Sequence, residues 1–223
     1  MVRSQVFYAN PLSGPGDFVG CVTEGPGIAS FPLGALRLES ALPASAGQAA
    51  NFVTWLGQPV PRHFRMTWRF EVVRGPGLAM LFFGTRGCNG EDAFAGQLRP
   101  RDGTYDCYRY GDIETHHLSY YRRALDEERA LRTVNLRRSP GFVLLAQGAD
   151  PMADVTDAPA DGYQLELVVS AAGVTFSVGE LLVLDWSAPD EAWAPAGGGY
   201  VGFRQVAPLI AQYRDVVVRA ISG

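Results

Sequence analysis

Side chains that can move protons and bind a carboxylate gather in the middle of the chain. His117, Tyr120 and Tyr121 lie close together in the sequence, and both histidine and tyrosine can take up or release a proton. Arginine offers a fixed, bidentate fork for a carboxylate, and an amide adds neutral hydrogen bonds. A β-elimination beside a carboxylate needs a base, an acid and a group that binds the carboxylate, and this stretch supplies all three. The candidates for carboxylate binding are Arg123, Asn135, Arg137 and Gln147.

His117 is the candidate base, and either Tyr120 or Tyr121 is the candidate acid. Alternate side chains of a regular strand point to opposite sides, so His117 and Tyr121 would share one side while Tyr120 would take the other. The side that holds Leu118 is the expected core side, which leaves His117 on the polar side with Arg123. Each residue type also has a structural interpretation. A strand arginine can be solvated or ion-paired, and a tyrosine can belong to the core with its hydroxyl bonded.

Two acidic residues suggest hydrolysis as an alternative. Glycoside hydrolases use two carboxylates about 5 Å apart when they retain the anomeric configuration, and a wider pair when they invert it. Asp112 and Glu114 lie two positions apart and would face the same side of a strand. A further alternative is sugar binding without chemistry, in which exposed aromatic rings stack on the sugar. Trp55, Trp186 and Trp193 are the candidates for stacking.

The spacing of the histidines does not favour a metal site. A zinc site needs three or four nitrogen, sulfur or oxygen ligands, and the adjacent side chains of His116 and His117 diverge on a regular strand. We therefore predict no metal centre and no other cofactor. Structural calcium is the one possibility left open, because Asp150, Asp154 and Asp157 supply oxygen ligands within one short segment.

The composition excludes several classes of function. The chain has 223 residues and a formal net charge of −4, so it has no overall positive field to attract nucleic acid or an anionic membrane. All 19 basic residues are arginine, which excludes chemistry that needs a lysine amine, such as a Schiff base. Ten of these arginines fall between Arg86 and Arg138, around the two adjacent histidines. The first residues carry no apolar segment of signal-peptide length, so we expect a cytoplasmic protein, and the sequence leaves the oligomeric state open.

Strands rather than helices must hold these side chains in place. Phe64–Val73 alternates strictly, which predicts a strand with one buried and one solvated face. Leu78–Phe83 follows an Arg-Gly-Pro-Gly turn, and we predict that these two strands pair as an antiparallel hairpin. No segment keeps a helical period for three turns, and 124–132 is the best helical candidate. Further strands are predicted at 52–56, 115–123, 131–138, 142–147, 163–169, 174–178, 181–186, 200–206 and 213–221.

Many short strands between glycine and proline turns predict one all-β domain, a sandwich or jelly roll, over residues 1–223. Gly173–Trp186 and the strands after it resemble the closing strands of concanavalin-A-like and laminin-G-like jelly rolls, which have two curved antiparallel sheets. The chain from about Asn10 to Val218 resembles the YesU-like family more specifically. The blocks that carry this resemblance are Asn89-Gly-Glu-Asp92, Gly111-Asp-Ile113, His117, Ser119-Tyr120, Arg122-Arg123, Asn135-Leu-Arg137, Gly141-Phe142, Ala146–Pro151 and Gly202-Phe-Arg-Gln205.

The resemblance implies a jelly-roll fold and a role in bacterial use of pectin-type polysaccharides, without an agreed reaction. Arg204 and Gln205 lie in the last block and become additional candidates for substrate binding. In this context the expected carboxylate is a uronate, and the expected partner is an acidic oligosaccharide. We therefore predict a polysaccharide or oligosaccharide lyase that works by β-elimination. A non-catalytic glycan-binding module and a glycoside hydrolase using Asp112 and Glu114 are the alternatives.

Overall fold

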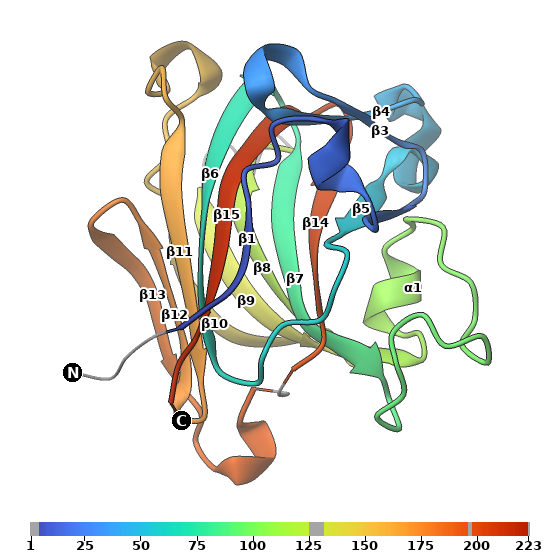
Figure 1. Cartoon of the computed structure of the whole chain (residues 1–223), viewed down its shortest axis with the longest axis vertical. Helices are drawn as coiled ribbons and strands as arrows, with labels where there is room; N and C mark the ends of the chain where they lie inside the picture. Colours follow the sequence, from blue (N-terminus) through green and yellow to red (C-terminus); the bar gives the residue numbers. More distant parts are fainter. Residues whose placement is uncertain (1–4, 125–131, 196–197, 223) are drawn as a thin grey trace.

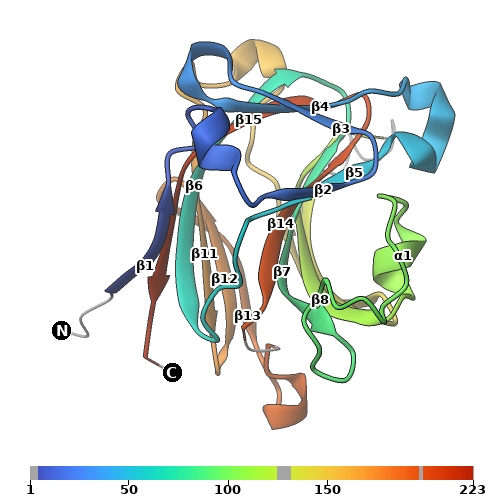
Figure 2. The same cartoon turned by 45° about the vertical axis from the view of Figure 1, so that its right-hand side comes forward.

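Two curved antiparallel β-sheets pack face to face in the computed structural model, which describes residues 5–124, 132–195 and 198–222 (Figures 1 and 2). The eight-stranded sheet consists of β1 (Gln5–Asn10), β3 (Gly27–Ser30), β4 (Leu36–Ser40), β6 (Phe64–Arg74), β11 (Tyr163–Ser170), β12 (Gly173–Val178), β13 (Leu181–Ser187) and β15 (Ile210–Ala220). The seven-stranded sheet consists of β2 (Val22–Glu24), β5 (Phe52–Trp55), β7 (Leu78–Gly87), β8 (Ile113–Arg122), β9 (Thr133–Ser139), β10 (Val143–Ala149) and β14 (Tyr200–Val206). The prediction of an all-β jelly-roll sandwich is confirmed.

The order of the strands differs from their order in the chain. The eight-stranded sheet runs β13-β12-β11-β6-β15-β4-β3, with β1 also paired to β15, and the seven-stranded sheet runs β10-β9-β8-β7-β14-β5-β2. Helix in the described residues is limited to α1 (Asp106–Arg109) and short 3₁₀ turns. Those turns are η1 (Pro15–Phe18), η2 (Pro32–Gly34), η3 (Ala44–Ala50), η4 (Val155–Asp157) and η5 (Glu191–Trp193). None of these helices is long and apolar enough to cross a membrane.

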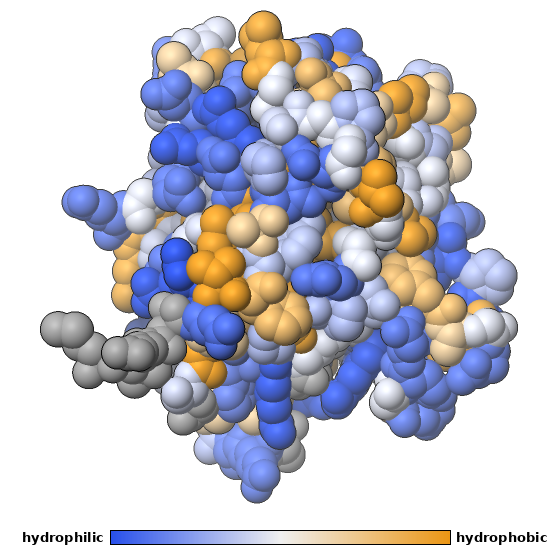
Figure 3. Space-filling view, in the orientation of Figure 1, coloured by the Kyte–Doolittle hydropathy of each residue, from blue (hydrophilic) through white to orange (hydrophobic). Residues whose placement is uncertain are grey.

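The main core lies between the two sheets. Along β6, the apolar residues of the alternating pattern are buried and the residues between them are partly or fully exposed, as the period of two predicts. Trp68 at the centre of β6 is fully buried and contacts the aromatic rings of Tyr120 and Phe203, which come from the opposite sheet. The face seen in Figure 3 mixes hydrophilic residues with small apolar patches. Trp55 and Trp68 are among the largest side chains that are fully buried.

The predicted hairpin between Phe64–Val73 and Leu78–Phe83 is wrong. β6 pairs with β11 and β15 in one sheet, whereas β7 pairs with β8 and β14 in the other. The turn after Arg74 therefore carries the chain from one sheet to the other. The continuous apolar run of β7 is the physical reason for this placement. A strand with apolar residues on both faces is stable where both faces are covered, and β7 is buried on both faces in the seven-stranded sheet.

Several other sequence-based expectations can be compared with the structure. The remaining strands from β5 onward lie close to their predicted positions, and β12 pairs with β13 as an antiparallel hairpin. The four strands before Phe52 were not anticipated; each of them spans only three to six residues. The helical candidate at 124–132 falls, apart from its two end residues, outside the described part of the chain.

The segment between β7 and β8 covers part of the outer, concave face of the seven-stranded sheet. Figure 2 shows α1, which belongs to this segment, lying across the hollow side of β7 and β8, away from the other sheet. A second apolar cluster forms beneath it, with Trp55, Phe82 and Tyr108 among its members. Arg101 and the hydroxyl of Tyr108 both bind the carboxylate of Glu24 on β2, at 2.7 Å each. These buried contacts fasten the segment to the sheet and define one wall of a groove.

Candidate functional site

A groove opens on the concave face of the seven-stranded sheet, beside α1. Its volume is about 410 Å³, within the range of typical ligand pockets, about 300–1,000 Å³. Strand residues form its floor, and the loop that carries α1 and the turn between β9 and β10 form its walls. The polar residues that line it are Gln48, Tyr105, Ser119, Arg122, Arg137 and Arg204. None of the described residues lining this groove is an acid, so its charge is positive.

A β-bulge in β8 decides which side chains reach this groove. Ser119 pairs with Met80 and Tyr121 pairs with Ala79, so Tyr120 is one extra residue between two consecutive pairs. An extra residue in one strand reverses the facing of every side chain after it. Tyr120 and Tyr121 consequently both belong to the core between the sheets. Arg122, which alternation placed on the core side, lines the groove instead.

Arg204 on β14 is a fully buried arginine without an acidic partner among the described residues. Its Nη1 donates a hydrogen bond to the carbonyl oxygen of Gly103 at 2.6 Å, while Nε and Nη2 have no hydrogen-bond partner in the described structure. Its guanidinium carbon lies 4.6 Å from the centre of the Tyr105 ring, and burial lowers the pKa of its guanidinium. An unpaired buried charge is costly, which makes this guanidinium the candidate anion-binding group of the groove.

Two more arginines flank Arg204 along the groove. Arg137 on β9 donates to the carbonyl oxygen of Phe142 at 3.3 Å, and its guanidinium carbon lies 4.2 Å from the centre of the Phe142 ring. Phe142 adopts a φ of 55° in the tight turn after β9, and this left-handed conformation is unusual for a residue with a side chain. On the neighbouring strands, the amide of Asn135 lies 2.7 Å from that of Gln147, and with its oxygen turned toward β8 it accepts a hydrogen bond from Arg122.

His117 lies behind the groove rather than in its lining. It is 2% exposed, and both of its ring nitrogens are engaged, Nδ1 with the Tyr105 hydroxyl at 3.0 Å and Nε2 with the Ser139 hydroxyl at 2.6 Å. Burial lowers the pKa of His117 to about 3, helped by repulsion from His116 and nearby arginines. His117 is therefore a neutral imidazole that hydrogen-bonds Tyr105, which itself lines the groove.

The family model for a domain of unknown function, DUF1961, matches residues 5–218. The chain belongs to the DUF1961 family. The predicted YesU-like resemblance is thereby confirmed: the chain is 42% identical over 212 residues to the uncharacterized protein YesU of Bacillus subtilis, covering 95% of this chain and 94% of that protein.

Solved structures show the same fold. A protein of unknown function with a galectin-like fold from Bacillus subtilis superposes with a TM-score of 0.91 at 41% identity, and 98% of each chain is covered. The exoplasmic/lumenal domain of VIP36, solved with Ca²⁺ and Man3GlcNAc bound, superposes with a TM-score of 0.60 at 14% identity, covering 99% of this chain and 91% of that domain. The DUF1961 chain thus has the jelly-roll architecture found in carbohydrate-binding proteins.

The structure separates the predicted site residues of this DUF1961 chain into three places. Arg137 and Arg204 line the groove, and His117, Asn135 and Gln147 lie next to it. Tyr120 and Gln205 lie in the core between the sheets. The Tyr120 ring packs edge-on against Phe70, and the Gln205 amide donates to two backbone carbonyl oxygens. Neither of these two side chains reaches the groove.

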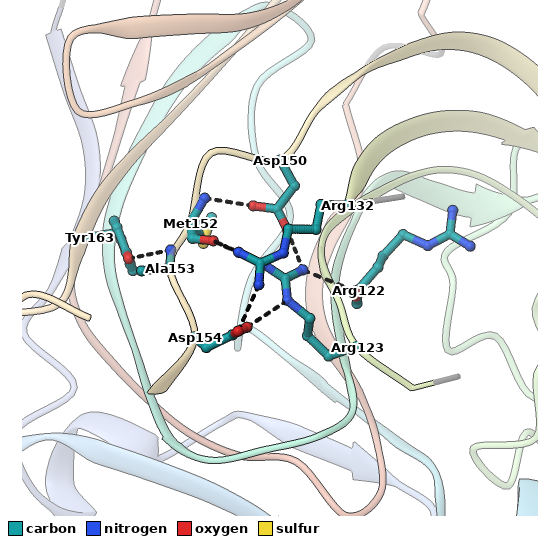
Figure 4. Close-up of polar contacts among 8 residues, drawn as sticks. All are labelled: Arg122, Arg123, Arg132, Asp150, Met152, Ala153, Asp154 and Tyr163. Atoms are coloured by element: carbon teal, nitrogen blue, oxygen red, sulfur yellow. Dashed lines mark hydrogen bonds and ion pairs between the residues drawn. The ribbon is translucent and has the colours of Figure 1, made fainter. Parts of the chain in front are cut away.

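Arg123 and Tyr121 lie outside the groove, at a separate hollow. Figure 4 shows Arg123 enclosed by polar partners, while the side chain of Arg122 points away from them. Arg123 donates from Nη1 to Asp150 at 2.6 Å and from Nε to Asp154 at 3.3 Å, and Arg132 binds Asp154 as well. This network neutralises the charge of Arg123 and holds it away from the groove. The structure therefore does not bring Arg123 together with the other residues predicted to bind a carboxylate.

The acidic and metal-binding alternatives also have definite places in the DUF1961 chain. Asp112 is paired with Arg99 and Glu114 with Arg86, and the two acids line different hollows. Two of the three carboxylates considered for calcium are engaged too, because Asp150 and Asp154 bind arginines. The described residues contain no group of three or more side chains arranged to hold a metal ion.

The tryptophans considered for stacking do not line the groove. Trp55 is fully buried under the segment that carries α1, and Trp193 lies at a different hollow, beside Arg138. Aromatic contact in the groove comes instead from Tyr105 and Phe142. Sequence reasoning missed Tyr105 because it lies in a loop, where no period predicts which way a side chain points. The family block Gly141-Phe142 was the one sequence signal for Phe142.

Proposed function

We propose that this protein binds acidic oligosaccharides in the concave groove and that Arg204 receives a uronate carboxylate. The observation that carries the proposal is the state of Arg204: it is fully buried, it has no acidic partner among the described residues, and its Nε and Nη2 are unbonded there. These two nitrogens present the planar edge that forms paired hydrogen bonds with a carboxylate. A bound carboxylate would compensate a charge that the fold leaves unpaired.

The rest of the groove supports an acidic sugar as the ligand. Arg122 and Arg137 add positive charge at the lining, and no carboxylate among the described lining residues opposes it. The hydroxyl of Ser119 and the amide of Gln48 offer neutral hydrogen bonds to sugar hydroxyls, and the rings of Tyr105 and Phe142 offer apolar contact. A sheet face that combines charge, hydroxyls and aromatic rings suits a pyranose that carries a carboxylate.

The three functions considered from the sequence need different chemical groups, and the groove does not supply all of them. Binding without chemistry needs only the features described above. Hydrolysis needs a carboxylate pair at the sugar, and Asp112 and Glu114 lie in other hollows. β-Elimination needs a proton-transfer group in the groove, and the hydroxyl of Tyr105, bonded to His117, is such a group. A lyase therefore remains a second candidate function.

Calorimetric titration of short uronate oligosaccharides tests the proposal. The matched ligand is the same oligosaccharide with its carboxylates reduced to hydroxymethyl groups, and the matched variants are Arg204→Met and Arg65→Gln. Arg65 is half-exposed on the other sheet, in an ion pair with Glu166. We expect the wild type and Arg65→Gln to prefer the uronate, and Arg204→Met to bind it roughly 10- to 100-fold more weakly, as loss of hydrogen bonds to a charged group implies. Equal affinity of the wild type for the two ligands would refute the proposal.

A further inference from the structure

One side chain in the groove can exchange a proton with a bound sugar. Of the described lining residues, Tyr105 is the one titratable group that is not an arginine. Its hydroxyl is hydrogen-bonded to Nδ1 of His117, and Nε2 of His117 is bonded to the hydroxyl of Ser139. This three-residue chain runs from the groove into the sheet, and each link can act as donor or acceptor. The hydroxyl of Tyr105 can therefore either donate to a ligand or accept from it.

Resting on the proposed function, we propose that Tyr105 is the catalytic residue of a β-elimination on a uronide held in the groove, and that His117 is its positioning residue. The guanidinium carbon of Arg204 is 4.6 Å from the Tyr105 ring centre, so a carboxylate on Arg204 would lie beside the Tyr105 side chain. The proposed reaction requires the hydrogen on the carbon that bears this carboxylate to face the phenolic oxygen. The positive charge of Arg204 beside that carboxylate stabilises the carbanion that forms next to it, and so makes this hydrogen more acidic.

The reaction balances with a single proton-transfer group. The phenolate oxygen of Tyr105 removes the hydrogen from C5 of the uronate, and the electron pair of that C–H bond forms the C4–C5 double bond. The bond between C4 and the glycosidic oxygen breaks, and the leaving oxygen takes the proton from the Tyr105 hydroxyl. The products are an unsaturated uronide and a sugar with a free hydroxyl, and Tyr105 returns to its starting state. No oxidant, reductant or metal is required.

The charges around Tyr105 and its burial shift its pKa in opposite directions. The groups that face it are Arg204 from β14, Arg137 from β9, Arg122 and His117 from β8, and Arg109 from α1. The four arginines favour the phenolate, but burial dominates and raises the pKa of Tyr105 to about 12. Below that pH the phenolate fraction grows tenfold per pH unit. The elimination rate should accordingly rise with about that slope from pH 7 to pH 10.

A single group that removes one proton and delivers it to the leaving oxygen acts on one face of the sugar. The C5 hydrogen and the C4 oxygen must then lie on the same face, as they do in 4-linked glucuronate and mannuronate. In galacturonate and guluronate they lie on opposite faces. The geometry therefore points to gluco- or manno-configured uronides as the substrate class.

The test combines binding and turnover on four ligands, the 4-linked oligomers of glucuronate, mannuronate, galacturonate and guluronate. Turnover is followed by absorbance of the unsaturated product near 235 nm, and binding by calorimetry. We expect turnover of a glucuronate or mannuronate oligomer, and Tyr105→Phe should lower kcat by roughly 100-fold or more while Kd changes less than about threefold. Binding without turnover by the wild type on all four would overturn this inference and leave the proposed function standing. Turnover confined to the galacturonate or guluronate oligomers would overturn it as well. Absence of binding would overturn the proposed function itself.

His117 needs a readout that a purely structural role would not move. His117→Asn keeps a polar atom near the position of Nδ1, whereas His117→Leu removes the hydrogen bond to Tyr105. With both variants folded by circular dichroism, we expect His117→Leu to lower kcat and to displace the pH–rate profile, and His117→Asn to restore much of the loss. Identical pH profiles for the wild type and both variants would contradict the positioning role.

Discussion

The guanidinium carbon of Arg204 lies 4.6 Å from the centre of the Tyr105 ring, although the two residues are almost a hundred positions apart in the chain. The contact joins β14 to the loop that carries α1, so it exists only once that loop has packed on the sheet. It places a buried cation, which has no acidic partner among the described residues, over the ring of a tyrosine that lines the same groove. Anion binding and proton transfer thus meet at this pair.

Removing the buried charge of Arg204 should leave the fold intact or make it more stable. Replacing buried charges by apolar side chains of similar size is often neutral or stabilising by about 1–4 kcal/mol. Because Nε and Nη2 of Arg204 have no partner in the described structure, Arg204→Met should keep or raise the free energy of unfolding in urea. The same variant should lose uronate affinity. A loss of several kcal/mol in stability would show instead that Arg204 is a structural residue.

Arg123 should behave in the opposite way. Its partner Asp150 has a fully buried carboxylate, so Arg123→Met leaves an unpaired buried charge and should destabilise the protein by about 3–5 kcal/mol. The exposed pair of Arg65 and Glu166 provides the control, and its loss should cost at most about 1 kcal/mol. Urea unfolding measures both variants. If Arg123→Met folds as well as the wild type but no longer binds the uronate, the network of Figure 4 is not its main role.

Acid should destabilise the protein through its two adjacent histidines. Burial lowers the pKa of His116 to about 4 and that of His117 to about 3, below the ordinary value of 6.5. The unfolded chain then binds more protons, so the free energy of unfolding is full above about pH 6.5 and falls as the pH drops toward these values. Thermal unfolding between pH 7.5 and pH 4 measures this loss.

The His116→Leu variant isolates one part of that effect. His116 stacks on Phe83 in the core, and neither ring nitrogen has a hydrogen-bond partner in the described structure. Leucine at this position should raise stability near pH 7 and make the acid-induced loss smaller. The same slope of stability against pH in the variant and the wild type would contradict the assignment of the loss to His116.

The ion pair under the loop should control how firmly Tyr105 is held. Glu24 accepts hydrogen bonds from both Arg101 and Tyr108, which lie on either side of Tyr105 in the sequence. Glu24→Ala should therefore weaken the packing of this loop and speed amide hydrogen exchange at Tyr105–Arg109, while exchange in β6 stays slow. Uniformly faster exchange across both regions would point to global destabilisation instead.

The sequence predicts the family and the strands from β5 onward well, but it predicts the site only in part. Alternation places His117 and Leu118 on the correct sides of β8, because that stretch is regular. It fails after Tyr120, since a bulge depends on pairing with β7 that no local pattern reveals. Arg122 therefore lines the groove, whereas the candidates Tyr121 and Arg123 do not.

Residues contributed by loops were harder to predict. Tyr105 enters the groove because the segment after β7 folds back over the concave face, a tertiary arrangement without a sequence period. Arg204 was a candidate only through the family block, and its significance lies in what surrounds it. The absence of an acidic partner in the described structure can be seen only after folding.

A crystal structure of the protein with a 4-linked uronate oligosaccharide tests the central claim most directly. The account predicts a carboxylate within about 3 Å of Nε and Nη2 of Arg204, with a sugar ring packed against the contacting rings of Tyr105 and Phe142. A uronate bound elsewhere with the groove empty, for instance at the hollow beside Trp193, would contradict it.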